Sequence, residues 1–213
     1  MIALNKKQRG ALAVDGLKKL YPQAKCSLEY THPYELLIAT RLSAQCTDAR
    51  VNIVTKDLFA KYKTLESLAN ADVSDIENII KSCGLFKTKA KDVVLMCRQL
   101  IENYDGALPD SIEELTSLSG IGRKTANLIM GDIFGKPAVV ADTHCIRICN
   151  RIGLVATTDP KKVELELKKI LDPLESNDFC HRLVLFGRDV CTARKAICEN
   201  CVLEGCCKKI IKK

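Results

Sequence analysis

The chain has 213 residues, of which 47% are hydrophobic and 28% charged. A chain of this length and apolar content can bury a sizeable core in one or two domains, so intrinsic disorder is not the expectation. Its formal net charge of +7 favours a polyanionic partner, although a basic balance alone does not establish one.

Twelve cysteines would suit a small secreted scaffold held by disulfides. The first seven residues, however, carry no apolar signal-peptide core, and no stretch approaches membrane-spanning length. We therefore expect reduced thiols and a cytoplasmic protein, associated with the nucleoid if the source is bacterial. Seven scattered cysteines lie mostly within apolar patterns and are expected to act as small hydrophobic residues: Cys26, Cys46, Cys83, Cys97, Cys145, Cys149 and Cys180.

Helical periodicity runs through almost the whole chain, and no alternating strand pattern interrupts it. Caps, prolines and glycines punctuate the pattern. The predicted helices are residues 2–21, 31–42, 48–62, a short one after Thr64, 72–80, 88–105, one capped near Ser111, one after Gly122, 142–152, 159–171 and 177–190. Only residues 138–141 read as extended, so the predicted fold is all-α. The basic residues 208–213 are expected to form a solvated end.

One stretch organises the rest, and it reads Leu-Ser-Gly-Ile-Gly-Arg-Lys-Thr-Ala-Asn over residues 118–127. It predicts a short turn that runs directly into an amphipathic helix, which together with the preceding helix makes a helix-hairpin-helix. Gly120 and Gly122 can take positive φ and leave backbone N–H groups uncovered. The helix behind them adds a partial positive charge. The turn is therefore a predicted seat for an anion such as a phosphate.

A lysine and a carboxylate accompany this seat. Lys124 lies in the first turn of the second helix, and eighteen residues later an apolar run delivers Asp142 at the head of another helix. Such a pair suits chemistry on a nucleotide sugar. Each residue also has a plain alternative, since a first-turn lysine is commonly solvated and an aspartate at this place is commonly an N-cap. Asp142 can be both a cap and a functional group.

These motifs, with Val-Ala-Asp-Thr-His at residues 140–144, resemble the helix-hairpin-helix DNA glycosylases. Within them the chain is most similar to the endonuclease III family, because the lysine of the bifunctional members is present. The resemblance implies a base-excision-repair DNA N-glycosylase and AP lyase that removes oxidised pyrimidines from double-stranded DNA. Lys124 would form a Schiff base, and β-elimination would then cleave the strand 3′ to the abasic site. A monomer is expected.

The resemblance also implies a domain organisation. A six-helix domain would span residues 23–134, and residues 1–22 with 135–213 would form a second domain that ends in a cluster loop at 187–213. DNA would lie in the cleft between them, with Lys124 and Asp142 on opposite lips.

Further DNA contacts carry over from the same resemblance. Gln45 matches the residue that fills the hole left by a flipped nucleotide, and Leu85 matches the wedge beside the unpaired partner base. The structural alternatives are a helix-end polar residue and a core leucine. Ser43 and Asp48 are candidates for the base pocket. The other expected DNA contacts are Gly120, Gly122, Arg123, Thr125 and His144. His144 is equally suited to a structural role.

Four cysteines near the end have the spacing C-x6-C-x2-C-x5-C: Cys191, Cys198, Cys201 and Cys207. Their density in a segment with little apolar sequence indicates a metal site, and spacing alone suits zinc and iron–sulfur equally. The resemblance selects a 4Fe–4S cluster. Cys206 could replace Cys207 by spacing, but the family pattern selects Cys207.

Two other functions remain open at this point. A pyrimidine-dimer glycosylase and AP lyase of the same fold would share every motif quoted. A non-catalytic DNA-binding or redox-sensing module could use the hairpin and the cluster, although the pairing of Lys124 with Asp142 argues against it.

Overall fold

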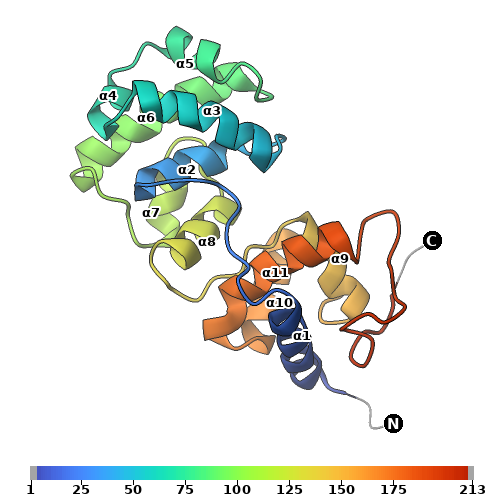
Figure 1. Ribbon diagram of the computed structural model, residues 1–213. Coiled ribbons are helices and arrows are strands. Elements are labelled where there is room, and N and C mark those ends of the chain that lie inside the picture. Colours follow the sequence, from blue (N-terminus) through green and yellow to red (C-terminus); the bar gives the residue numbers. More distant parts are fainter. Residues whose placement is uncertain (1–3, 211–213) are drawn as a thin grey trace. The chain divides into compact units, whose positions relative to one another are not determined.

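The computed structural model describes residues 4–210 as helices joined by turns (Figure 1). The all-α prediction is confirmed, since the described residues form no named strand and only one isolated bridge, between Cys191 and Ala196. The elements are α1 Lys6–Leu20, α2 Pro33–Leu42, α3 Asp48–Lys61, α4 Leu65–Ala69, α5 Val73–Ile79, α6 Phe86–Tyr104, α7 Ile112–Ser117, α8 Arg123–Asp132, α9 Thr143–Ile152, α10 Pro160–Ile170, η1 Pro173–Glu175 and α11 Ser176–Asp189. No helix in residues 4–210 combines the length and the apolar character that crossing a membrane requires.

Several helix starts follow from local capping, and some differ from prediction. The Asn5 side chain accepts from the Gln8 N–H in a capping box, so α1 begins at Lys6 instead of residue 2. Residues 2 and 3 of that predicted helix, and 211–213 of the predicted solvated end, lie outside the described residues. The start of α6 was predicted at residue 88 and is at Phe86, because Leu85 takes a left-handed conformation and ends the preceding turn.

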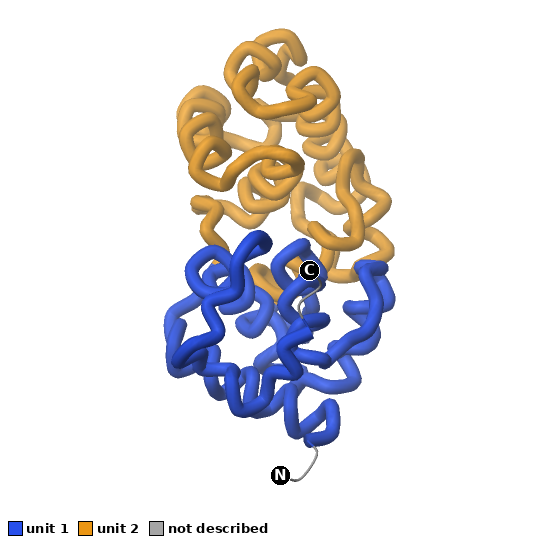
Figure 2. The backbone as a smooth tube through the Cα atoms, turned by 90° about the vertical axis from the view of Figure 1, so that its right-hand side faces the viewer, with its two compact units in different colours: residues 1–25, 135–213 blue, residues 26–134 orange. Residues whose placement is uncertain are grey.

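The chain divides into two compact units, coloured separately in Figure 2. One is continuous and spans residues 26–134, whereas the predicted domain began at 23. The other combines residues 1–25 with 135–213. The hairpin therefore belongs to the continuous unit, and the cysteine cluster belongs to the unit to which the chain returns after α8.

The continuous unit is built around α6, which contacts α2, α4 and α5. Helix α6 buries Val93, Met96 and Cys97, and α2, which contacts it, is buried on most sides, with Leu36, Leu37 and Ile38 all inaccessible to solvent. The hairpin helices α7 and α8 pack on each other, and α8 also contacts α2. The hairpin thereby rests on the core of this unit.

In the discontinuous unit, α11 packs against α1 and α9, and α1 also contacts α10. Arg182 of α11 is 2% exposed, and its guanidinium donates to Glu175 at 2.8 Å and Asp178 at 2.9 Å. Of the seven scattered cysteines predicted as core residues, five are buried, while Cys26 and Cys46 are half-buried.

Candidate functional site

The hairpin consists of α7, a turn over residues 118–122, and α8. Ser111 caps α7 by accepting from the Glu114 N–H at 3.2 Å. The turn closes where the Ile121 N–H donates to the Leu118 carbonyl at 3.1 Å, and both side chains are buried. Local capping and two apolar anchors therefore fix the turn on the unit's core.

Gly120 is required by both its backbone and its surroundings. Its φ is +73°, which lies in the left-handed region that favours glycine. A Cβ there would meet Nε of Arg41 and stand 2.8 Å from a carboxylate oxygen of Asp92. The turn is thus closely packed on an ion pair that joins α2 to α6.

That ion pair also holds the turn by hydrogen bonds. Arg41 donates to one Asp92 oxygen through Nε at 2.8 Å and Nη2 at 2.6 Å. The Ser119 hydroxyl donates to the other Asp92 oxygen at 2.9 Å, and the Ser119 N–H donates to Gln99 at 2.8 Å. Sequence reasoning missed this support, because it joins residues from α2, α6 and the turn.

Gly122 behaves differently from the prediction. Its φ is −102°, in the extended region that any residue adopts, so the expected positive φ is wrong for this position. It is the N-cap of α8, makes no side-chain cap, and a Cβ there would meet nothing within 4 Å. The first-turn N–H groups of α8 therefore lack the side-chain acceptor that an N-cap usually supplies.

Lys124 is exposed in the first turn of α8, between half-buried Arg123 and Thr125. Among residues 4–210, no hydrogen bond or ion pair engages its ammonium group. The hairpin thus presents the exposed Lys124 amine beside N–H groups that have no side-chain cap.

Asp142 is the N-cap of α9, where one carboxylate oxygen accepts from the Cys145 N–H at 2.7 Å. The side chain is half-buried. His144 is the second residue of α9, in its first turn, and its Nδ1 lies 3.2 Å from Nη2 of Arg147. A Cβ on Gly187 of α11 would meet this ring nitrogen, so one edge of the ring packs on α11. Asp142 and His144 belong to the discontinuous unit, and Lys124 belongs to the other.

Gln45 and Leu85 lie on two turns of the continuous unit, and both are exposed. Gln45 follows α2 with a φ of 56°, and Leu85 precedes α6 with a φ of 59°. Leu85 is 58% exposed, so the alternative of a core leucine is wrong. The Ser43 hydroxyl donates to the Thr40 carbonyl at 2.8 Å, and Asp48 accepts from the Ser27 hydroxyl at 2.6 Å.

The structure brings the four predicted cysteine ligands to one pocket, which Cys191, Cys198, Cys201 and Cys207 line with Ile148, Ile152, Phe186 and Leu203. Cys206 is buried outside that lining, with its thiol 3.4 Å from the Leu203 carbonyl. Arg151 of α9 donates to the Cys191 sulfur at 3.2 Å and to the Thr192 carbonyl at 2.7 Å. In the described residues, no three His, Cys, Asp or Glu side chains converge as they would around a single metal ion.

Comparison with known proteins gives consistent matches over most of the chain. The family described as "HhH-GPD superfamily base excision DNA repair protein" matches residues 38–173. Endonuclease III of Synechocystis sp. is 45% identical over 204 residues, which are 95% of this chain and 93% of that protein. Endonuclease III of Haemophilus influenzae is 40% identical over 192 residues, 90% and 91% of the two chains. A solved structure of a trapped endonuclease III–DNA covalent intermediate, an estranged-adenine complex, has a TM-score of 0.90 at 40% identity and covers 97% of each chain.

Proposed function

Because the chain belongs to the endonuclease III family of HhH-GPD base excision DNA repair proteins, it is a DNA glycosylase and AP lyase, and we propose that Lys124 is its nucleophile and Asp142 the carboxylate that assists it. The observation that carries the proposal is the exposed amine of Lys124, in the same first turn of α8 whose N–H groups lack a side-chain cap and suit a phosphate. A relative trapped as a covalent intermediate on DNA supports a covalent route.

The proposed reaction begins with a damaged base turned out of the duplex. The neutral Lys124 amine attacks C1′ of the deoxyribose, a C–N bond forms, and the base leaves with the electrons of the glycosidic bond and takes up a proton. Ring opening gives an imine between lysine and sugar. Loss of a C2′ proton then expels the 3′ phosphate by β-elimination. The Asp142 carboxylate stabilises the positive charge that develops at the sugar.

The hairpin would bind the phosphate beside the reacting sugar. The first-turn amides of α8 lack a side-chain cap, so they are available to an anion at the positive end of the helix. Gly122 has open space where a Cβ would stand. A glycine is therefore not needed there for packing, and it suits the close approach of a DNA backbone. Arg123 and Thr125 would add contacts from the same turn.

Gln45 and Leu85 would replace the extruded nucleotide and wedge beside its partner base. Exposed apolar side chains inserted at a kinked step compensate for lost stacking. The estranged adenine in the relative's complex is consistent with such an unpaired partner. His144 would contact DNA through the ring edge that does not face α11.

The four pocket-lining cysteines suit a 4Fe–4S cluster, which thiolates hold. The fit rests on their shared pocket and on Arg151, whose guanidinium lies beside the Cys191 sulfur. Cys191, Cys198, Cys201 and Cys207 would be the ligands. The cluster would shape the loop that carries Arg194 and Lys195, so that it presents positive charge to phosphate, and it has no assigned step in the reaction.

We further propose that the protein acts as a cytoplasmic monomer on damaged duplex DNA, with oxidised pyrimidines as its substrates. The test of the nucleophile is borohydride trapping on abasic duplex DNA. Lys124→Gln should abolish trapping while duplex binding persists. Arg123→Gln, which removes the neighbouring positive charge, should weaken binding but retain trapping at saturating DNA. Normal trapping by Lys124→Gln would refute the assignment.

A further inference from the structure

Lys89 is the fourth residue of α6 and is 0% exposed. Lysine is almost never fully buried unless it is paired, and a cation is disfavoured near the positive end of its own helix. Burial accordingly lowers the pKa of Lys89. Residues 4–210 place no carboxylate in a salt bridge with it, so its compensation must come from elsewhere.

The ammonium group of Lys89 binds the carbonyls at the end of α2. It donates to the Leu42 carbonyl at 2.8 Å and to the Ala44 carbonyl at 2.7 Å. These carbonyls lie at and beyond the last residue of α2, where a cation is favoured. Ala44 immediately precedes Gln45. The Lys89 side chain therefore fixes the turn that presents Gln45.

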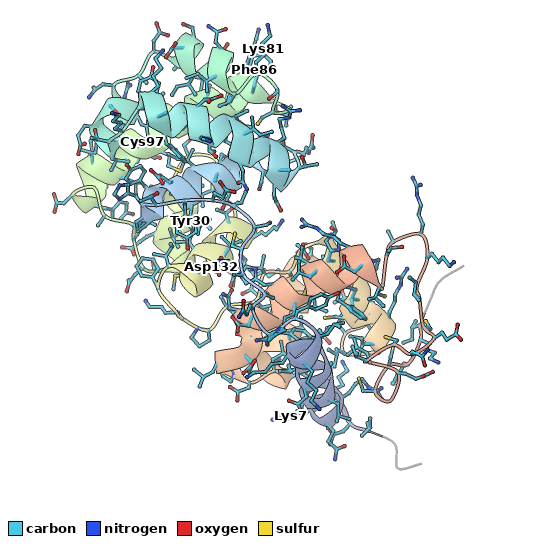
Figure 3. All side chains as sticks on the ribbon, viewed as in Figure 1. Lys7, Tyr30, Lys81, Phe86, Cys97 and Asp132 are labelled. Carbon is cyan, nitrogen blue, oxygen red and sulfur yellow. The ribbon has the colours of Figure 1, made fainter. Side chains whose placement is uncertain are left out.

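The backbone of the same residue anchors the second turn. The Lys89 N–H donates to the Leu85 carbonyl at 3.1 Å, the first bond of α6. The two turns are also neighbours, since a Cβ added at Gly84 would stand 3.6 Å from the Gln45 carbonyl oxygen. Lys89 is thus bonded to both turns, one through its side chain and one through its main chain. Figure 3 labels Phe86, the residue that follows Leu85 at this end of α6.

Both presented residues need such support. Gln45 and Leu85 have φ values of 56° and 59°, and left-handed backbone at a non-glycine residue persists only where its surroundings enforce it. Neither exposed side chain supplies that support itself. We propose that Lys89 is a positioning residue that holds the Gln45 and Leu85 turns together in the geometry that DNA insertion requires. This inference rests on the proposed wedge roles of Gln45 and Leu85.

The test compares AP-lyase rates on one abasic site in duplex and in single-stranded DNA, because only the duplex has a stack to fill. Lys89→Met keeps the aliphatic stem and removes the donors. It should lower the duplex-to-single-strand rate ratio at least about tenfold, since a misplacement of about 1 Å can cost 10²-fold in rate. It should also suppress the fluorescence change of a 2-aminopurine placed opposite the site. Lys89→Gln, which retains an amide donor, should fold readily and give an intermediate ratio.

Leu68→Ala is the matched control. Leu68 is fully buried in α4, which packs on the same α6, so this variant loses stability without touching either turn. Its rate ratio should equal that of the wild type. If Lys89→Met or Lys89→Gln also retains the wild-type rate ratio, Lys89 has no positioning role. If the rate ratio of Leu68→Ala falls as much as that of Lys89→Met, the effect comes from lost stability alone.

Two further measurements separate this inference from the proposed function. If Gln45→Ala and Leu85→Ala leave the ratio unchanged, the wedge roles fail. Amide hydrogen exchange without DNA tests Lys89 independently of them. Exchange at residues 43–46 and 84–86 should accelerate together in Lys89→Met and stay at wild-type rates in Leu68→Ala. Unchanged protection of both turns in Lys89→Met would overturn the inference.

Discussion

Gly120→Ala and Gly122→Ala separate the structural from the DNA-binding demand on the hairpin. Alanine at 120 must adopt a φ of +73°, and its methyl group would displace Arg41 from Asp92. The left-handed backbone costs about 1–2 kcal/mol, and leaving a part-buried charged group without its partner costs about 1–3 kcal/mol. We therefore expect the free energy of unfolding to fall by about 2–5 kcal/mol.

Gly122→Ala meets neither penalty, because φ is −102° and the Cβ position is open. Only a weaker N-cap remains, which costs about 1 kcal/mol or less. Its duplex affinity should nevertheless fall, because the methyl group covers the α8 amides. Urea titrations followed by circular dichroism suit this chain, which contains no tryptophan, and anisotropy of labelled duplex measures affinity. If Gly120→Ala is as stable as the wild type, or Gly122→Ala binds DNA normally, the reasoning is wrong.

Three further outcomes are expected. Asp142→Asn keeps an N-cap side chain but removes the charge. Lyase turnover should therefore fall about 100-fold or more while thermal stability stays near wild type. If Asp142→Asn instead loses as much stability as Asp142→Ala, the residue acts only as a cap. Cys207→Ser should lose iron and acid-labile sulfide in anaerobically purified protein while Cys206→Ser retains both, and stoichiometric zinc without sulfide in the wild type would contradict the cluster. Lys18 and then Arg182 lower the pKa of Glu175 from its ordinary 4.5, so its stabilisation is present above that value and is lost as the pH falls through the lower folded-state pKa. Glu175→Gln should therefore be less stable than wild type in urea at pH 7, and the difference should shrink as the pH is lowered below 4.5.

Helix positions were predictable where a single side chain decides the start. Thr47, Thr64 and Asp72 each accept from an N–H two or three residues onward, and this short-range bond is readable from sequence. The start of α6 was not, because Thr88 resembles a cap while the structure ends the turn at Leu85 with left-handed backbone. Lys89, whose N–H donates to the Leu85 carbonyl, binds the end of α2 through its side chain, and α2 lies more than forty residues earlier in the sequence.

The candidate site divides in the same way. The hairpin, Lys124 and the capping role of Asp142 follow from short motifs, and the roles of Lys124 and Asp142 in catalysis stay predictions. The two glycines looked equivalent, yet only Gly120 has positive φ, because only Gly120 packs against another helix pair. Lys89 did carry a signal, since it lies on the apolar stripe that continues to Val93 and Met96. A lysine at helical spacing with core residues is a candidate for a buried, functional cation.

Two helix N-termini supply the proposed chemistry in opposite ways. The α8 terminus has a glycine N-cap and no side-chain acceptor, so its amides and positive end remain available to phosphate. At the α9 terminus Asp142 satisfies the Cys145 N–H with one carboxylate oxygen, which fixes the side chain. In the proposed reaction its second oxygen would stabilise the developing positive charge. A serine cap on α8 would compete with the anion, whereas loss of the Asp142 cap would release the carboxylate from its position. The same backbone groups would therefore bind substrate in one helix, by the proposed mechanism, and they orient a carboxylate in the other, and the difference follows from a single residue type at each N-cap.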